Sequence, residues 1–387
     1  MKKILKFGSY VLVAALAAAL TLTMVTVQQR QEPRKLMQME KLIQERFIGE
    51  VDQQAMEDAA AQAMVEALGD RWSHYLTASS YLSYQERAEN AFVGVGITIT
   101  PAGQGFQIVE VEALGPAKEA GVQPGDLLVQ VDGQDVTQLS TDQVKELVRG
   151  EEGSTVTLGL LRQGQTLSLP VQRSRIQVQV AAGTMLEGQV GLVTIENFDD
   201  RCAQETIAAV DALMEQGAKA LIFDVRNNPG GYAHEMVKAL DYLLPEGELF
   251  RMEHYDGRQT VDKSGPECVD LPMAVLVNGD SYSAAEFFAA ALREYEAALV
   301  VGEQTCGKGY FQNTFRFQDG SALALSVGKY YTPKGVSLAG VGITPDVPVE
   351  VDEETAAAIY YNALEPDQDP QIQAALEALE KYQKEAA

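Results

Sequence analysis

Apolar residues at three- and four-residue spacing predict helices near the start of the chain. Between residues 36 and 47 they share one helical face, which ends at Gly49. An alanine-rich run at about residues 53–68 predicts a second helix that ends at Gly69, because glycine favours the position just past a helix. A third, short helix is expected at about residues 80–89. Helices this small bury little apolar surface alone, so we expect them to pack on another segment or on a second subunit.

Residues 92–173 have a different pattern, in which short β-branched runs alternate with turn residues. This pattern predicts strands within GVGITIT, FQIVEVE, LLVQVDGQDV and STVTLGLLRQGQTLSLPVQ. Two helices are expected between them, at residues 116–120 and 142–148. Ser140 and Gln143 have the spacing of a capping box at the start of the second helix.

Beyond residue 177 strands and helices alternate, which predicts an α/β domain with a largely parallel sheet. Strands are expected in GQVGLVTIENF, AKALIFDVRN, LPMAVLVNG and AALVVGE, with helices between them. A hairpin then turns at Asp319-Gly320. The tail from Asp352 is acidic and helical, and it has one apolar face: Ile372, Ala375, Leu376 and Leu379. Together with the helices of residues 33–90, this short tail predicts a homodimer.

Composition narrows the classes of function. The chain has 387 residues, enough for two to three domains. A formal net charge of −25, without basic clusters, excludes nucleic acid as a partner. The cysteines allow one disulfide, and nothing in the sequence selects its pair. Cysteines and histidines lack metal-ligand spacing, so we expect neither a metal nor a cofactor; they are Cys202, Cys268, Cys306, His74, His234 and His254.

The N-terminus predicts export. Lys2, Lys3 and Lys6 precede an uncharged, mostly apolar run at residues 7–27, which is long enough to cross a bilayer as a helix. The lysines stay cytoplasmic by the positive-inside rule, which places the rest of the chain outside the cell membrane. The favoured interpretation is an uncleaved, single-pass anchor. The alternative is a signal peptide cleaved at residues 17–19, which would make the protein secreted.

Loops that follow strands of the α/β domain carry candidate chemistry, because ligands of such sheets bind beyond the carboxyl ends of the strands. In the first loop, DVRNNPGGY, Gly230 and Gly231 can turn a backbone N–H toward a ligand, although such a turn is also an ordinary connection. In VNGDSYSAAEFF, Ser283 precedes a helix and the next N–H, that of Ala284, is suited to stabilise an oxyanion. Ser283 and Glu286 have the spacing of a capping box as well.

The third loop, GEQTCGKGYFQ, supplies a candidate base. Lys308 lies between two glycines, which lets the backbone approach closely and confines the amine. Burial disfavours the charged form of a lysine and lowers its pKa. A neutral amine can deprotonate a serine hydroxyl. Gln312 lies four residues further on, and its carbonyl oxygen can orient the amine without adding a charge.

Two resemblances follow from these motifs. Residues 92–173, with GVGI before the second strand and AGVQPGDLLVQVDGQDV after the short helix, resemble a PDZ domain of the bacterial protease-associated type. This implies that a peptide C-terminus binds at Gly94, Val95, Gly96 and Ile97, with the peptide added as a strand. The alternative is that these glycines are only turn residues.

The motifs D-V-R-N-N-P-G-G, N-x-x-S-x-S-A-A-E and T-x-G-K-G-x-x-Q resemble the carboxyl-terminal processing peptidases, the S41-type serine proteases. The resemblance, which runs from about residue 92 to 349, implies that Ser283 is the nucleophile, Lys308 the general base and Gln312 the residue that orients the lysine. It also implies that Gly230 or Gly231 supplies the second N–H of the oxyanion hole beside Ala284, and that Ser281 is not the nucleophile. Tyr282, Ala285 and Cys306 depart from the family pattern, so we expect substrate preference and loop packing to differ from those of the family.

The expected fold class is therefore α/β, with a crotonase-like catalytic domain, an inserted α+β PDZ domain and helical N- and C-terminal segments. The expected boundaries are 1–30 for the anchor or signal segment, 31–91 for the helical region, 92–174 for the PDZ domain, 175–350 for the catalytic domain and 351–387 for the tail.

The leading hypothesis is an extracytoplasmic serine endopeptidase that cleaves unfolded or C-terminally exposed proteins, engaged through the PDZ domain. A second hypothesis is a catalytically silent PDZ scaffold at the membrane surface, which would have no need of Ser283, Lys308 and Gln312. A third is a Ser-His hydrolase that uses His234, although nothing in the sequence orients that ring.

Overall fold

The computed structural model describes residues 35–112 and 115–386. The predicted membrane segment, residues 7–27, lies outside the described residues. Within the two described ranges, no helix is long and apolar enough to cross a membrane. The chain divides into two compact units, Met1–Gly69 and Asp70–Ala387.

The described part of the first unit consists of α2 (Lys35–Arg46) and α3 (Gln53–Glu66). The carboxylate of Asp52 caps α3 by accepting a hydrogen bond from the N–H of Ala55 at 3.0 Å. Gly69 has a φ of +66°, which confirms the predicted glycine stop. Large apolar side chains of α2 are exposed, namely Leu36, Met37, Met39 and Leu42.

The predicted PDZ region contains one antiparallel sheet in the order β3-β4-β5-β7-β8, which leaves β3 at an edge. Its strands are β3 (Ile97–Ala102), β4 (Gly105–Val111), β5 (Leu127–Val131), β7 (Thr155–Arg162) and β8 (Gln165–Gln172), and the short β6 (Gln134–Asp135) pairs with β5. The helices α5 (Pro116–Glu119) and α6 (Thr141–Val148) complete a separate apolar core. The predicted capping box of Ser140 and Gln143 is confirmed at both of its hydrogen bonds.

The main sheet has the order β10-β11-β12-β15-β16-β19 and is parallel from β11 to β19, which confirms the predicted parallel sheet. Its strands are β10 (Ala181–Leu186), β11 (Val190–Ile195), β12 (Ala220–Asp224), β15 (Met273–Val277), β16 (Ala298–Gly302) and β19 (Val347–Pro348). The 3₁₀ turn η1 (Glu187–Gln189) joins β10, an antiparallel edge strand that the sequence pattern did not reveal, to β11.

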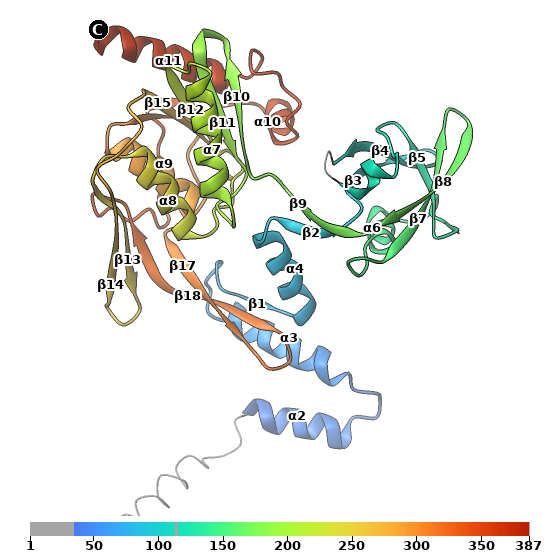
Figure 1. Ribbon diagram of the computed structural model, residues 1–387. Coiled ribbons are helices and arrows are strands. Elements are labelled where there is room, and N and C mark those ends of the chain that lie inside the picture. The colour runs from blue at the N-terminus through green and yellow to red at the C-terminus, as the bar shows by residue number, and fades with distance from the viewer. Residues whose placement is uncertain (1–34, 113–114, 387) are drawn as a thin grey trace, which may run out of the picture. The chain divides into compact units, whose positions relative to one another are not determined.

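Helices cover both faces of the main sheet, which explains why its central strands are continuous apolar runs. All five residues of β15 are buried. On one face lie α7 (Cys202–Glu215), α8 (Ala233–Leu243) and α9 (Ala284–Glu294), and on the other lies α11 (Pro370–Ala386), as Figure 1 shows. Alternate residues of β12 divide between the two cores, with Leu221 in the first and Ile222 in the second.

The C-terminal tail corrects one of the arguments for a homodimer. It consists of α10 (Glu353–Tyr360) and α11, and Ile372, Ala375 and Leu379 are buried against the main sheet. The apolar face of the tail is therefore covered by its own chain. Arg226, just past β12, contacts both Asp224 (2.5 Å) and Asp369 (2.8 Å), which joins the tail to the sheet. The homodimer prediction then rests on residues 33–90 alone.

A second sheet borders the loops that carry the candidate chemistry. It has the order β1-β18-β13-β14, and β17 pairs with β18. Its strands are β1 (His74–Leu76), β13 (Gly247–His254), β14 (Gln259–Ser264), β17 (Tyr310–Arg316) and β18 (Ala322–Tyr331). The predicted hairpin turn at Gly320 is confirmed, with a φ of +89°. The β13–β14 hairpin and β1 were not predicted.

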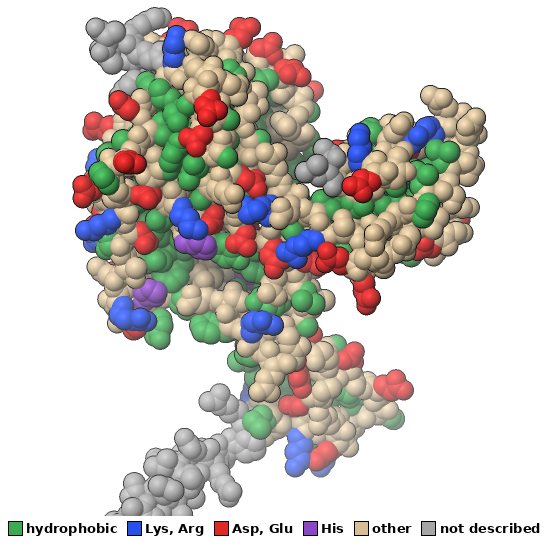
Figure 2. Space-filling model, in the orientation of Figure 1, with side chains coloured by type: hydrophobic (Ala, Val, Ile, Leu, Met, Phe, Trp, Pro, Cys, Tyr) green, Lys and Arg blue, Asp and Glu red, His purple; other side chains and the backbone are tan. Residues whose placement is uncertain are grey.

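The remaining elements are α4 (Ala78–Ala88) and the pair of β2 (Ala91–Gly94) with β9 (Ser174–Gln177). The pairing of β2 with β9 closes the chain on both sides of the predicted PDZ residues. Figure 2 shows acidic side chains scattered over the visible face rather than gathered in one patch. On this face the negative charge is thus distributed, which suits solubility.

Candidate active site

Ser283 stands on a strained turn between β15 and α9. Its φ is 59° and its ψ is −124°, a conformation that a residue with a side chain rarely adopts. The neighbouring loop holds this turn in place: Asn278 exchanges hydrogen bonds with Asn227 at 2.9 and 2.8 Å, and the N–H of Tyr282 donates to the carbonyl of Asn228 at 3.1 Å. The hydroxyl of Ser281 donates to the carbonyl of Val225 at 2.7 Å, so Ser281 serves as a tie between the two loops.

Glu286 is a buried carboxylate that binds the loops of both Ser283 and Lys308. Its Oε2 accepts the backbone N–H of Ser283 at 3.0 Å and that of Lys308 at 2.8 Å. Its Oε1 accepts the N–H of Gly307 at 2.7 Å and the hydroxyl of Thr305 at 2.6 Å. The side chain is 0% exposed, so all four hydrogen bonds are shielded from water. The sequence placed Glu286 in a capping box, but its bonds to residues 305–308 had no sequence signal.

The amine of Lys308 lies between aromatic rings. Its Nζ is 4.8 Å from the centroid of Trp72 and 5.6 Å from that of Tyr282. Burial lowers the pKa of Lys308, and the charges of Cys306, Glu286 and Asp70 oppose this shift without reversing it. The direction of the shift is the one that a lysine base requires.

Gln312 lies on β17, beside the same cavity as Lys308. Its Nε2 donates to the hydroxyl of Ser326 at 3.0 Å and to the carbonyl of Tyr310 at 3.3 Å. Among the described residues, no hydrogen bond joins Gln312 to the amine of Lys308. The role of Gln312 in orienting the lysine therefore stays a prediction.

The P-G-G loop packs directly on the Ser283 turn. A Cβ on Gly230 would lie 2.7 Å from Cβ of Ser283 and 2.9 Å from the nitrogen of Ala284, so only glycine fits there. The N–H of Gly230 donates to the side chain of Asn228 at 2.8 Å, which occupies it. Within the described part of the chain, the N–H groups of Gly231 and Ala284 have no hydrogen-bond partner. Of the two glycines, Gly231 is therefore the one with an available donor.

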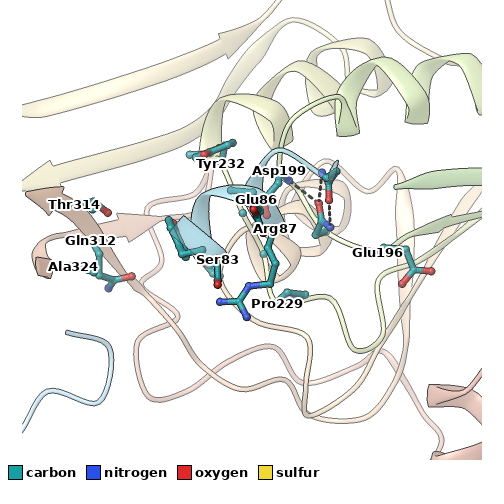
Figure 3. Close-up of a pocket in the computed structure, with 18 of the residues that line it drawn as sticks. Ser83, Glu86, Arg87, Glu196, Asp199, Pro229, Tyr232, Gln312, Thr314 and Ala324 are labelled. Carbon is teal, nitrogen blue, oxygen red and sulfur yellow. Dashed lines mark hydrogen bonds between the residues drawn. The ribbon is translucent and has the colours of Figure 1, made fainter. Parts of the chain in front are cut away.

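Ser283, Lys308, Gln312, Gly230 and Gly231 line one cavity of about 1050 Å³. Figure 3 shows its other walls, which include Ser83, Glu86 and Arg87 from α4 together with Tyr232, Thr314 and Ala324. Glu196 and Asp199 follow β11 and also line the cavity. Burial, with a smaller contribution from Asp200, raises the pKa of Asp199 to about 7. Sequence reasoning did not single out Asp199.

Two other predicted sites lie elsewhere. Gly94, Val95, Gly96 and Ile97 form the junction of β2 and β3, where Val95 is buried and Gly96 has a φ of +76°. The side chain of His234 is 61% exposed, its Nε2 is 3.6 Å from the carboxylate of Glu235, and it is not among the described residues that line the cavity. The three cysteines are free thiols.

Comparison with known families gives three matches. Residues 189–349 match the model of peptidase family S41, and residues 107–162 match the PDZ domain. Residues 14–80 match a family described as the N-terminal domain of the activating protease CtpB.

Curated relatives include two proteins named "Probable CtpA-like serine protease". The one from Staphylococcus saprophyticus is 32% identical over 326 residues, which are 83% of this chain and 66% of that protein. The one from Staphylococcus haemolyticus is 32% identical over 356 residues, covering 89% of this chain and 72% of that protein. This chain thus spans about two thirds of the length of such relatives.

Solved structures also align with this chain. A protein of Bacteroides fragilis NCTC 9343 assigned to the S41 proteases aligns with a TM-score of 0.54 at 17% identity, covering 83% of this chain and 90% of that one. A photosystem II D1 C-terminal processing protease aligns with a TM-score of 0.48 at 28% identity, covering 82% and 87%.

Proposed function

Because this chain belongs to peptidase family S41, we propose that it is a serine endopeptidase in which Ser283 is the nucleophile and Lys308 the general base. The reaction is acyl transfer to the serine, followed by hydrolysis. No step requires a metal or a cofactor, because a neutral amine can take the serine proton directly.

The steps follow from the two side chains. The Oγ of Ser283 attacks the carbonyl carbon of the scissile peptide bond while the Nζ of Lys308 accepts the hydroxyl proton. The resulting ammonium gives this proton to the leaving nitrogen as the C–N bond breaks, which leaves an ester on Ser283. Lys308 then accepts a proton from a water molecule, whose oxygen attacks the ester carbon. As the bond from that carbon to Oγ of Ser283 breaks, the ammonium returns this proton to Oγ and the second product leaves as a carboxylic acid.

The observation that carries the proposal is the shared anchoring of the two residues. One oxygen of Glu286 accepts the N–H of Ser283 at 3.0 Å and that of Lys308 at 2.8 Å, although the two are 25 positions apart. Both side chains line the same cavity, and burial lowers the pKa of the Lys308 amine. One buried carboxylate thus fixes the backbone of both the nucleophile and the base beside the same cavity, which supports this reaction.

The oxyanion of the tetrahedral intermediate would be stabilised by the N–H groups of Ala284 and Gly231. Ala284 is the first residue of α9, so its N–H also carries the positive end of the helix dipole. Gly231 has a φ of +148°, which a side chain would oppose, and it lies in the loop that packs on Ser283.

We further propose that substrates enter by their C-terminal ends. The edge strand β3 supports this, since its unpaired side can accept a peptide strand beside Gly94, Val95, Gly96 and Ile97.

The pairing of β2 with β9 supports an inserted PDZ domain, and the parallel main sheet supports a crotonase-like catalytic fold. An extracytoplasmic location and attachment by residues 7–27 belong to the same proposal, as does a homodimer formed through the exposed apolar side chains of α2.

The test compares the purified full-length chain with Ser283→Ala and Lys308→Met on an unfolded protein. Lys308→Met keeps an unbranched apolar stem of similar size and removes only the amine. We expect each change to lower kcat/KM by roughly 10⁴-fold. Cleavage that persists in both variants would overturn the mechanism, and absence of cleavage by the unmodified chain would favour the scaffold hypothesis.

A further inference from the structure

The segment Asp70–Ser73, Asp-Arg-Trp-Ser, reaches the candidate base from a distant part of the sequence. It directly precedes β1, which pairs with β18 so that His74 lies opposite Ala324. This pairing brings Trp72 beside Lys308, and its ring centroid is 4.8 Å from the Nζ of that residue. The rings of Trp72 and Tyr282 are 6.0 Å apart and form two walls beside the amine.

Asp70 is held next to this pair by its own hydrogen bonds. Its carboxylate accepts the hydroxyl of Ser73 at 2.6 Å and the N–H of Trp72 at 3.1 Å. Ser73 in turn accepts the N–H of Ser326 at 3.0 Å, and the hydroxyl of Ser326 accepts Nε2 of Gln312 at 3.0 Å. Burial raises the pKa of Asp70, but hydrogen bonds from Ser73, Ser326 and Trp72 outweigh it and lower the pKa overall. Asp70 is therefore a fixed negative charge at neutral pH.

We propose that Trp72 and Asp70 are positioning residues for Lys308, in which Trp72 keeps water from the amine and Asp70 supplies a balancing negative charge. This inference rests on the proposed function, because it assigns these residues to the base of that reaction. Neither residue was singled out in the sequence.

The two residues act on the amine in opposite directions. Burial is the largest influence on the pKa of Lys308 and lowers it, so the apolar wall of Trp72 favours the neutral amine. The face of the ring also attracts a cation, which opposes the effect of burial. Asp70 attracts the ammonium form and raises the pKa.

Other charged and titratable groups also face the amine. Cys306 and Glu286 favour the ammonium form, as Asp70 does. The guanidinium carbon of Arg71 lies 4.5 Å from the centroid of the Trp72 ring. Burial raises the pKa of Tyr282, so its phenol stays neutral.

The experiment measures the pH profile of kcat/KM on a short peptide, using the full-length chain. For Trp72→Ala we expect the acid limb to move up by about one pH unit, which is a tenfold loss below that limb. Trp72→Phe restores an apolar ring and should return the limb most of the way. Asp70→Asn keeps the hydrogen-bond acceptor and removes the charge, so its limb should move down by about half a unit, a roughly threefold gain on the acid side.

Tyr255→Ala is the matched control, because this ring is 82% exposed and its loss removes an aromatic group outside the cavity. Its limb should coincide with that of the unmodified chain. An unshifted limb in both Asp70→Asn and Trp72→Ala, or a shift of the two variants in the same direction, would overturn the inference. If Trp72→Ala does not fold, the shift of Asp70→Asn decides the matter. Lys308→Met separates a failure of this inference from a failure of the proposed function, because full activity in that variant would refute Lys308 as the base.

Discussion

Ser283 lies on a turn that hydrogen bonds hold in place, whereas the amine of Lys308 lies between aromatic rings. The turn of Ser283 is tied through Asn278 and Tyr282 to the neighbouring loop. Among the described residues, the Nζ of Lys308 makes no hydrogen bond or ion pair, and it faces Trp72 and Tyr282 instead. A nucleophile needs a fixed direction of attack, which backbone bonds provide. A lysine base needs a lowered pKa, which the exclusion of water from the amine provides.

Substitutions around Ser283, the hydrogen-bonded side of the cavity, should therefore have different effects from substitutions around Lys308, the aromatic side. Changes on the hydrogen-bonded side should lower the free energy of unfolding and activity together, because they remove partners from buried polar groups. Changes on the aromatic side should move the pH profile with less effect on stability. Glu286 belongs to both sides, because it holds the backbone of each residue.

The largest effect is expected from Glu286→Ala. This change leaves the N–H groups of Ser283, Gly307 and Lys308 and the hydroxyl of Thr305 without their buried acceptor. We expect a loss of about 3–5 kcal/mol in the free energy of unfolding, measured with urea, and loss of cleavage. Glu286→Gln should recover only part, because its amide would present N–H groups to N–H donors. A stability within about 1 kcal/mol of the parent would contradict this role.

Gly230→Ala should have the next largest effect. Its Cβ would lie 2.7 Å from Cβ of Ser283 and 2.8 Å from the carbonyl oxygen of Tyr282, so the nucleophile's turn must move. We expect roughly a hundredfold loss of kcat/KM and a loss of about 1–3 kcal/mol in stability.

Gly257→Ala separates this clash from backbone strain. Gly257 has a φ of +80°, close to the +87° of Gly230, but nothing lies within 4 Å of its added Cβ. We expect this control to lose about 1 kcal/mol and to keep full activity. Equal losses of kcat/KM in the two variants would show that contact with Ser283 is not the cause.

The same comparison explains which parts could be predicted from the sequence. Ser283 and Lys308 follow neighbouring strands of a parallel sheet, and the carboxyl ends of such strands meet at one edge. The alternation of strands and helices was therefore enough to predict that the two loops lie at the same edge of the sheet. The strand–helix alternation likewise predicted α7, α8 and α9 correctly, because long apolar runs covered on both faces are a strong signal.

Other contacts depend on long-range packing and had no local signal. Trp72 meets Lys308 only because β1 pairs with β18, some 250 positions away. Asn228 occupies the N–H of Gly230, and this could not be foreseen from a P-G-G turn. The sequence of α11 is amphipathic, and this pattern is the same whether the apolar face packs on its own sheet or on another chain. The face packs on its own sheet, so the tail was wrongly taken to support a dimer.

The smallest effect should come from Asp199, on the hydrogen-bonded side of the cavity. Its pKa is about 7 in the folded chain, against an ordinary value of 3.8. The folded chain therefore binds more protons than the unfolded chain between these values, and its stability falls as the pH rises through that range. Asp199→Asn stays neutral, so it should equal the parent near pH 4 and exceed it above pH 7. Because the side chain is only half-buried, we expect a gain of about 1 kcal/mol in the free energy of unfolding at pH 8. Urea unfolding of both proteins at several pH values measures this difference in stability. A difference that does not grow with pH would mean that the Asp199 carboxylate is hydrated in the folded chain. The pH response of this cavity would then come from Lys308 and its surroundings alone.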